Sequence, residues 1–243
     1  MPSFWEHVKR VLREADIIIE VLDARLIEES RNKEIEDKIA RLGKQLLFVF
    51  NKCDLADTAT LEKAKKEYHP SVFISSTKKL GTTILLQKIL ELSKGQPVVV
   101  GIVGYPNVGK SSLINALAGR NAARTSGESG FTKGFQKVRI SRKIVLLDTP
   151  GVFPYQKKSG LDVVKIGAVD YAKVEDPEIA ALELIQEYDF LIKGYYRVEG
   201  ETADDILEQI AFKLNRLHQG GKPDYDSAAR QVLKDWQKGK IRA

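Results

Sequence analysis

GIVGYPNVGKSSLINALAG, residues 101–119, contains the pattern G-x-x-x-x-G-K-[ST] over residues 104–111. An apolar run precedes the pattern at residues 97–104, and a segment with helical spacing follows it at residues 110–118. A glycine-rich turn between a strand and a helix is the context in which this pattern forms a phosphate-binding loop. Its glycines let the backbone curl so that successive N–H groups face the phosphates. The stretch therefore predicts a phosphate-binding loop near the middle of the chain.

Apolar runs alternate with amphipathic segments on both sides of this loop. Strands are predicted over residues 15–23, 45–50, 71–75, 97–104, 135–140 and 143–148, and helices over residues 31–43, 57–69, 82–95 and 110–118. This alternation predicts a parallel sheet covered on both faces. Only Ser141 and Arg142 separate the last two strands, so we expect a hairpin with one antiparallel strand. The predicted fold class is α/β, with a mostly parallel six-stranded sheet.

Beyond about residue 172 only helical patterns follow. Three amphipathic segments predict helices, at residues 176–193, 202–218 and 224–242. Thr202 precedes an acidic residue by three positions, close to the pattern of a capping box. We therefore predict two domains, an α/β domain over residues 1–172 and a small all-α domain over residues 173–243.

The composition is that of a soluble globular protein, with 43% hydrophobic and 30% charged residues. No apolar run reaches the roughly 18 residues of a membrane span, and the N-terminus lacks the apolar core of a secretory signal. The single cysteine, Cys53, cannot form an internal disulfide. These features predict a cytoplasmic protein without a membrane partner. The net charge of +6 permits a polyanionic partner such as RNA, but a basic enzyme without one would have the same charge.

Asn51-Lys52-Cys53-Asp54 follows a predicted strand and is a candidate for base recognition. A carboxylate accepts hydrogen bonds from both N1 and N2 of guanine, and adenine offers no such pair, so Asp54 would select guanine. The stem of Lys52 can lie over the purine plane, and Asn51 can tie this loop to its neighbours. The tetrapeptide alone is a common polar turn. Beside a phosphate loop in the same sheet, it predicts that the nucleotide is GTP or GDP.

Three further segments supply groups for the phosphates and for Mg²⁺. Lys110 is expected to reach the terminal phosphates, and the Ser111 hydroxyl to hold Mg²⁺. Asp148 ends a predicted strand in LLDTPG, where it can hold a Mg²⁺-bound water, and the Gly151 N–H can meet the γ-phosphate. Thr132 lies between the loop and this strand, and it is the candidate switch residue that closes on Mg²⁺ and the γ-phosphate.

The backbone around Ser75 and Ser76, after another predicted strand, is expected to contact guanine O6. The predicted catalytic residues are Lys110, Thr132 and Gly151, and the predicted metal ligands are Ser111, Thr132 and Asp148. The predicted nucleotide-binding residues are Asn51, Lys52, Asp54, Ser75, Ser76, Asn107, Val108, Gly109, Lys110, Ser111, Ser112 and Asp148.

The order of these motifs is unusual. In ordinary G proteins the phosphate loop comes first and the guanine-selecting loop follows, whereas here residues 51–54 precede residues 104–111. Parallel sheets tolerate such a permutation, because their sites are assembled from loops at the carboxyl ends of the strands. The part of the chain before the phosphate loop is therefore predicted to be the base-recognition half of a circularly permuted P-loop GTPase domain.

With this motif order, the sequence resembles the YlqF/RbgA-like family of circularly permuted ribosome-assembly GTPases over nearly its whole length. The resemblance includes VLDAR at residues 21–25 and the closing segment at residues 220–241. It implies that the chain hydrolyses GTP with Mg²⁺ and acts in large-subunit assembly. It also implies that the helical domain contacts ribosomal RNA or a precursor of the large subunit. We expect a monomer.

The sequence departs from the family where a catalytic water would be placed. Bacterial members carry a PGHM stretch upstream of the first strand, which this sequence lacks; His7 is more consistent with an ordinary helix surface. Val152 follows DTPG where many G proteins have a water-orienting Gln, so intrinsic hydrolysis is expected to be slow. Asn107 matches a position that in related G proteins helps hold K⁺, which makes K⁺ a candidate cofactor by resemblance.

Three assignments stay open between alternatives. Arg25 has either a nucleotide or switch role or a place in a surface ion pair. The tail either binds RNA or is a plain structural bundle. The tail residues concerned are Tyr195, Tyr196, Arg197, Lys222, Arg230, Lys234, Lys238, Lys240 and Arg242. A second class of function, a nucleotide-dependent regulatory module for a protein partner with little hydrolysis, also fits the nucleotide motifs.

Overall fold

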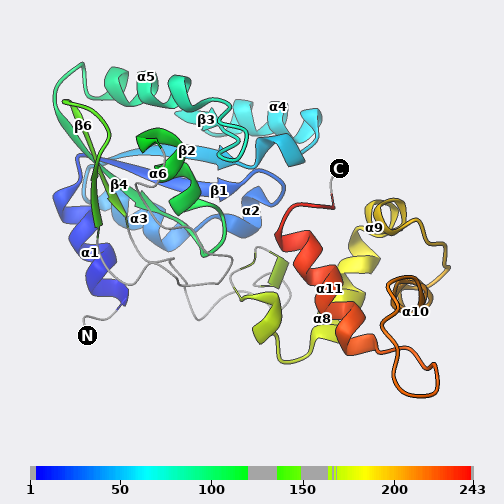
Figure 1. Cartoon of the computed structure of the whole chain (residues 1–243). Coiled ribbons are helices and arrows are strands. Elements are labelled where there is room, and N and C mark those ends of the chain that lie inside the picture. The colour runs from blue at the N-terminus through cyan, green and yellow to red at the C-terminus, as the bar shows by residue number, and fades with distance from the viewer. Residues whose placement is uncertain (1–3, 120–135, 149–163, 166, 168, 242–243) are drawn as a thin grey trace. The chain divides into compact units, whose positions relative to one another are not determined.

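The structure, a computed structural model, describes residues 4–119, 136–148, 164–165, 167 and 169–241. The chain divides into two compact units, residues 1–154 and residues 155–243 (Figure 1). This division comes earlier than the predicted boundary at residues 172/173. The reason is visible near the C-terminus, where side chains of the last helix bind the backbone just before that boundary. Trp236 Nε1 donates to the Lys165 carbonyl at 3.1 Å, and Gln237 Nε2 donates to the Val169 carbonyl at 3.0 Å.

The first unit contains a six-stranded sheet with helices on both faces (Figure 1). Its strands are β1 (Ile17–Asp23), β2 (Gln45–Asn51), β3 (Ser71–Phe73), β4 (Val98–Val103), β5 (Gln136–Arg139) and β6 (Ile144–Asp148). Its helices are α1 (Phe4–Glu14), α2 (Ile27–Ser30), α3 (Lys33–Arg41), the 3₁₀ turn η1 (Cys53–Leu55), α4 (Thr58–Glu67), α5 (Thr82–Leu92) and α6 (Lys110–Ala118). The strand order is β3-β2-β1-β4-β6-β5, and only β5 runs antiparallel to its neighbour. The predicted mostly parallel sheet with a closing hairpin is confirmed.

Burial on both faces explains why the central strands are continuous apolar runs. All seven residues of β1 are buried, as expected when helices cover a parallel sheet on each side. Val8 and Val11 of α1 and Ile35 and Ile39 of α3 pack in one cluster with Ile18 of β1. Helix α5 lies on the opposite side of the sheet from α1 and α3 (Figure 1). The helices thereby hold the strands in register and position the loops that follow them.

The second unit is helical. It contains the 3₁₀ turn η2 (Tyr171–Lys173) and the helices α8 (Pro177–Glu187), α9 (Asp189–Tyr196), α10 (Ala203–Lys213) and α11 (Tyr225–Gln237). Helix α11 packs against both α8 and α10, with Val232 and Trp236 buried. Thr202 and Asp205 form a complete capping box at the start of α10, in agreement with the sequence pattern.

The single helix predicted over residues 176–193 is wrong, because the chain bends between α8 and α9. The bend is at Tyr188, whose backbone leaves the helical region at φ −125° and ψ 36°. The Tyr188 ring packs on the Trp236 ring with centroids 4.5 Å apart. A contact between distant residues therefore holds the conformation that interrupts the helix. Among the described residues, no helix is both long enough and apolar enough to cross a membrane.

Candidate functional site

The carboxyl ends of β1, β2, β4 and β6 lie at the same edge of the sheet. Asp23 pairs in register with Asn51 across β1 and β2, and Asp148 pairs in register with Ile102 across β6 and β4. Because these strands are parallel, the segments that follow them emerge together. The guanine-selecting motif, the phosphate loop and the Asp148 motif are thus brought to one edge despite their separation in sequence.

The phosphate loop depends on two glycines with positive φ. Gly104 has φ +145°, and a Cβ atom there would lie 2.5 Å from the Val21 carbonyl oxygen. Gly109 has φ +100°, and a Cβ atom there would lie 2.2 Å from Asn51 Nδ2. Both conformation and space exclude a larger residue. Helix α6 begins directly afterwards, and the N-terminus of a helix is a favourable place for an anion.

Asn51 connects the three loops of the site. Its side chain is buried, with Nδ2 donating to the Val108 carbonyl of the phosphate loop at 2.9 Å. Its Oδ1 accepts from the Ser76 backbone N–H at 3.1 Å and from the Ser76 hydroxyl at 2.9 Å. One amide therefore ties the guanine-selecting motif to the phosphate loop and to the loop after β3.

The loop after β3, whose backbone is predicted to contact guanine O6, uses two of its amides within the protein. The Ser75 N–H donates to the Leu80 carbonyl at 3.2 Å, and the Ser76 N–H is bound by Asn51. Both donors are therefore used within the protein. Among the described residues, the N–H of the exposed Thr77 makes no such bond. The Thr77 N–H is therefore a further candidate donor for guanine O6 in the same loop, because the SST pattern does not say which amides the fold uses.

Asp54 presents a carboxylate that stays ionised. Its Oδ2 lies 3.1 Å from Lys78 Nζ, and 9% of its side chain is exposed. Burial raises the pKa of Asp54, but the hydrogen bond from Ser75 and the charge of Lys78 together lower it by more. The pKa therefore lies below its ordinary value. An ionised carboxylate is the acceptor that the N1 and N2 donors of guanine require. Lys78 was not among the predicted site residues.

A buried cluster of charged side chains binds Lys52 of the guanine-selecting loop. Asp23, at the end of β1, accepts from Arg25 Nε at 3.0 Å, from Arg25 Nη2 at 2.8 Å and from Lys52 Nζ at 2.8 Å. Burial raises the pKa of Asp23, but Arg25 and Lys52 together lower it by more than burial raises it. The carboxyl is therefore ionised at neutral pH. One of the two alternatives for Arg25 was a surface ion pair. Arg25 does form an ion pair, but a buried one, because only 7% of its side chain is exposed.

Lys110 folds back on the phosphate loop. Its Nζ donates to the Gly104 carbonyl at 2.9 Å and to the Tyr105 carbonyl at 2.7 Å. Burial lowers the pKa of Lys110 to about 8, although the carboxylate of Asp148 opposes the shift. An ammonium held on carbonyl oxygens at the loop is ready to exchange them for phosphate oxygens, which are stronger acceptors.

The donor set fits Mg²⁺, which prefers hard oxygen ligands and is usually shared with phosphates. The Asp148 carboxylate is buried at the end of β6, and the Ser111 and Ser112 hydroxyls stand on the first turn of α6. Within the described ranges, no three His, Cys, Asp or Glu side chains cluster as a protein-only metal site would require. The other predicted groups, Thr132, Gly151 and Val152, lie outside the described residues.

Two of the aromatic and basic tail residues are part of the helical framework. Tyr196 is 5% exposed and donates its hydroxyl to Asp235 at 2.9 Å, so its ring cannot stack on a base. Arg230 donates from Nη1 to three backbone carbonyls, those of Tyr171, Ala172 and Val174. Tyr196 therefore belongs to the core of the helical unit, as the structural alternative held, because a buried hydroxyl needs a partner. RNA contact by Arg230, which is only partly buried, stays a prediction. Arg242 lies outside the described residues.

Comparison with known proteins gives the same family from sequence and from structure. A family model described as "50S ribosome-binding GTPase" matches residues 99–210. An uncharacterized GTP-binding protein of Methanocaldococcus jannaschii is 42% identical over 96% of this chain and 65% of its own length. Nucleolar GTP-binding protein 2 of Yarrowia lipolytica is 35% identical over 98% of this chain and 49% of its own length. This chain thus spans about half to two thirds of these relatives.

Solved structures of YlqF from Thermotoga maritima have the same architecture. The GDP-bound form superposes with a TM-score of 0.73 at 25% identity, covering 97% of this chain and 95% of that one. The GNP-bound form superposes with a TM-score of 0.71 at 26% identity, covering 98% and 94%. Together with the permuted order of the motifs around the sheet edge, these matches show that the chain belongs to the YlqF-like family of circularly permuted GTPases.

Proposed function

We propose that this chain binds GTP, hydrolyses it slowly with Mg²⁺, and acts in assembly of the large ribosomal subunit through contact with ribosomal RNA. The observation that carries the nucleotide part is the hydrogen-bond network of Asn51. It joins a carboxylate-bearing loop suited to guanine with a loop suited to phosphates. Neither loop alone would specify GTP. Because Asn51 binds both loops, it fixes the distance between the base-binding and phosphate-binding groups.

Each residue of the site has a role in this proposal. Asp54 accepts from N1 and N2 of guanine, and the Thr77 N–H donates to O6. Lys110 leaves the loop carbonyls for the terminal phosphates, and backbone N–H groups at the start of α6 surround them. Ser111 and Asp148 would hold Mg²⁺, which neutralises phosphate charge when bound. Thr132 and Gly151 keep their predicted contacts to the γ-phosphate, and Asn107 keeps its predicted role toward K⁺.

The ribosomal part draws its support from the relatives. The matching family model is described as ribosome-binding, and several relatives are named nucleolar GTP-binding proteins. No observation specifically favours the alternative of a regulatory module for a protein partner. We therefore place the chain among assembly GTPases whose turnover depends on a ribosomal particle.

Single-turnover hydrolysis with and without large-subunit precursors tests this proposal. Without a water-orienting Gln at position 152, the basal rate should be on the order of 10⁻³ s⁻¹ or slower. Precursor particles should raise it by roughly tenfold or more, and K⁺ should support more activity than Na⁺. A fast basal rate in Na⁺ alone would contradict the proposal, as would a rate that no particle changes.

The pKa of Lys110 predicts a pH dependence of nucleotide affinity. Free protein loses the Lys110 proton near pH 8, whereas bound phosphates favour the charged form and raise that pKa. Binding must therefore take up a proton above pH 8, and GTP affinity should fall by about tenfold for each further pH unit. Affinity measured from pH 7 to 9.5 checks this. Lys110→Arg keeps its charge over this range and controls for titration of the base itself. A flat profile in the unmodified protein would contradict the prediction.

A further inference from the structure

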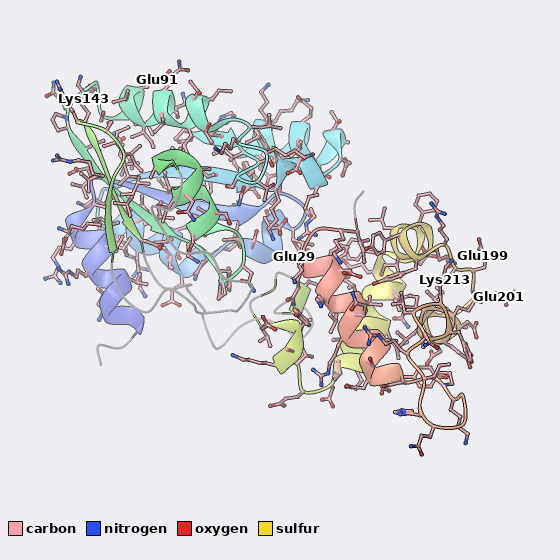
Figure 2. All side chains as sticks on the ribbon, viewed as in Figure 1. Glu29, Glu91, Lys143, Glu199, Glu201 and Lys213 are labelled. Carbon is pink, nitrogen blue, oxygen red and sulfur yellow. The ribbon has the colours of Figure 1, made fainter. Side chains whose placement is uncertain are left out.

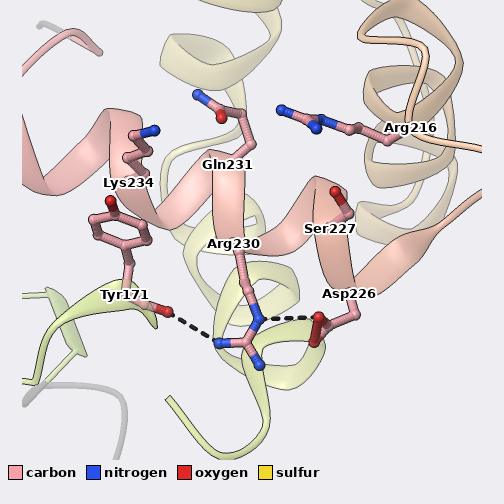
Figure 3. Close-up of a pocket in the computed structure, with 7 residues that line it drawn as sticks. All are labelled: Tyr171, Arg216, Asp226, Ser227, Arg230, Gln231 and Lys234. Carbon is pink, nitrogen blue, oxygen red and sulfur yellow. Dashed lines mark hydrogen bonds and ion pairs between the residues drawn. The ribbon is translucent and has the colours of Figure 1, made fainter. Parts of the chain in front are cut away.

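The helical unit contains a pocket of about 260 Å³ that the nucleotide site does not use. It lies between η2, the segment that follows α10, and α11 (Figure 3). Its lining residues are Tyr171, Arg216, Asp226, Ser227, Arg230, Gln231 and Lys234. Three cationic side chains and one aromatic ring therefore meet around a small polar space.

Two of the three cations are available to a ligand. Arg230 pairs with Asp226 at 2.9 Å and also donates to carbonyls of η2, so its charge is balanced. By contrast, the Arg216 guanidinium forms no hydrogen bond or ion pair with any described residue. Lys234 Nζ has one partner among the described side chains, the face of the Tyr171 ring, 5.7 Å from its centroid. The pocket therefore carries an excess of positive charge.

Backbone hydrogen bonds fix the positions from which the Arg216 and Tyr171 side chains extend. The Arg216 N–H donates to the Ala211 carbonyl at 2.8 Å, and its carbonyl accepts from the Asp224 N–H at 2.9 Å. The Tyr171 N–H donates to Gln237 Oε1 at 3.2 Å. In Figure 3, Arg216 extends toward α11, and Lys234 lies over the Tyr171 ring. The fixed backbone keeps the bases of these side chains close together, so a ligand needs to order only the side chains themselves.

The basic residues of the unit are concentrated in its C-terminal segment. Residues 155–243 carry 14 Lys and Arg residues against 16 Asp and Glu residues, so the unit as a whole is not basic. Residues 213–242 nevertheless carry eight basic residues against three acidic ones. Before them, Glu199 and Glu201 lie in the segment between α9 and α10 (Figure 2). The segment that contains α11 and the pocket's cationic residues is therefore the basic part of the unit.

The chemistry and the size of the pocket together select an occupant. A volume of about 260 Å³ lies below the roughly 300–1,000 Å³ of sites that enclose a whole small molecule. It suits one anionic group of a larger molecule. We propose that the pocket binds one phosphodiester of a single-stranded or looped RNA through Arg216 and Lys234, with an adjacent base on the Tyr171 ring. Arg and aromatic side chains recognise unpaired RNA in this way. The inference rests on the proposed ribosomal function and adds the residues that make the contact.

The experiment measures binding of the full chain to labelled single-stranded polyuridine and to large-subunit precursors at several salt concentrations. Arg216→Ala and Lys234→Ala should each weaken binding and each lower the salt slope by about 0.7, the value for one lost phosphate contact on a single strand. Tyr171→Leu should weaken binding by about 5- to 150-fold, whereas Tyr171→Phe should retain it. Lys238→Ala is the matched control, because Lys238 is exposed and follows Lys234 by one helical turn outside the pocket. It should change binding least.

Several results would overturn the proposal. If the pocket variants bound RNA as well as Lys238→Ala does, the pocket would not be the RNA-binding site, but the proposed ribosomal function would be unaffected. If the unmodified chain bound neither polyuridine nor the precursors, both the RNA-binding pocket and the proposed ribosomal function would be contradicted. Inorganic phosphate or polyglutamate that displaces polyuridine at equal site concentration would show that a free anion or an acidic protein, and not RNA, is the ligand. Lys240 is unsuitable for substitution, because it pairs with the buried Asp235 at 2.7 Å.

Discussion

Asp54→Asn should convert a GTP site into one that prefers xanthosine triphosphate. Asp54 carries an ionised carboxylate, which accepts two hydrogen bonds from guanine, whereas an amide offers one acceptor and one donor. That pair matches the edge of xanthine, whose C2 carries an oxygen in place of the amino group. Losing the charge-assisted pair should cost GTP about 2–3 kcal/mol, or roughly 30- to 150-fold in affinity. Xanthosine triphosphate should gain correspondingly, and competition binding with both nucleotides and ATP measures the ratio.

Asp57→Asn is the matched control for this experiment. Asp57 lies three residues further on, where its carboxylate accepts from the Thr60 N–H at 2.8 Å and caps α4. Asn caps helices about as well as Asp, so the same chemical change there should alter neither stability nor base preference. If Asp54→Asn left the ratio of GTP to xanthosine triphosphate affinity unchanged, Asp54 would not be the base-selecting residue.

Asp23→Asn should cost about 3–5 kcal/mol of unfolding free energy, because it leaves Arg25 and Lys52 buried without a compensating charge. Asp23 is fully buried, and both cations bind it within 3.0 Å. Its pKa lies below its value in an unfolded chain, so this stability is fully present at neutral pH. It is lost only as the pH falls below about 4. Urea denaturation of the nucleotide-free protein measures the change.

A surface ion pair provides the comparison for Asp23. Glu34→Gln removes the partner of Lys38 on α3, where both side chains are substantially exposed, and should cost less than about 0.5 kcal/mol. Nucleotide affinity should fall in Asp23→Asn as well, since Lys52 loses the anchor that holds its loop. A cost for Asp23→Asn as small as that of the surface pair would show that water already screens the cluster.

Local sequence patterns predicted most of the fold. The buried runs of β1 and β4, the hairpin of β5 and β6, and the caps at Asp57 and Thr202 all follow from short-range rules. These rules succeed because each depends on residues close in sequence. They failed at Tyr188, where packing on Trp236 divides a pattern that is helical throughout.

The sequence predicted which residues form the site but not the hydrogen bonds and ion pairs between them. The motif NKCD identified Asn51, Lys52 and Asp54, yet it could not show that Asp23 holds Lys52. The SST pattern indicated the loop after β3 but could not show that the Ser76 amide donates to Asn51. In the tail, the sequence left Tyr196 and Arg230 open between RNA contact and a structural role, and only the structure shows their hydrogen bonds within the helical unit.

The sequence by itself determined the class of site, because a phosphate loop, a guanine-selecting carboxylate and their reversed order are properties of short motifs. Only the tertiary structure decided which groups remain available for a ligand. Hydrogen bonds formed by the fold engage the Ser75 and Ser76 amides, the Tyr196 hydroxyl and the Arg230 guanidinium, and they leave the Thr77 amide and Arg216 available. The physical reason is that a buried polar group must find a partner, and the partner is set by the whole fold.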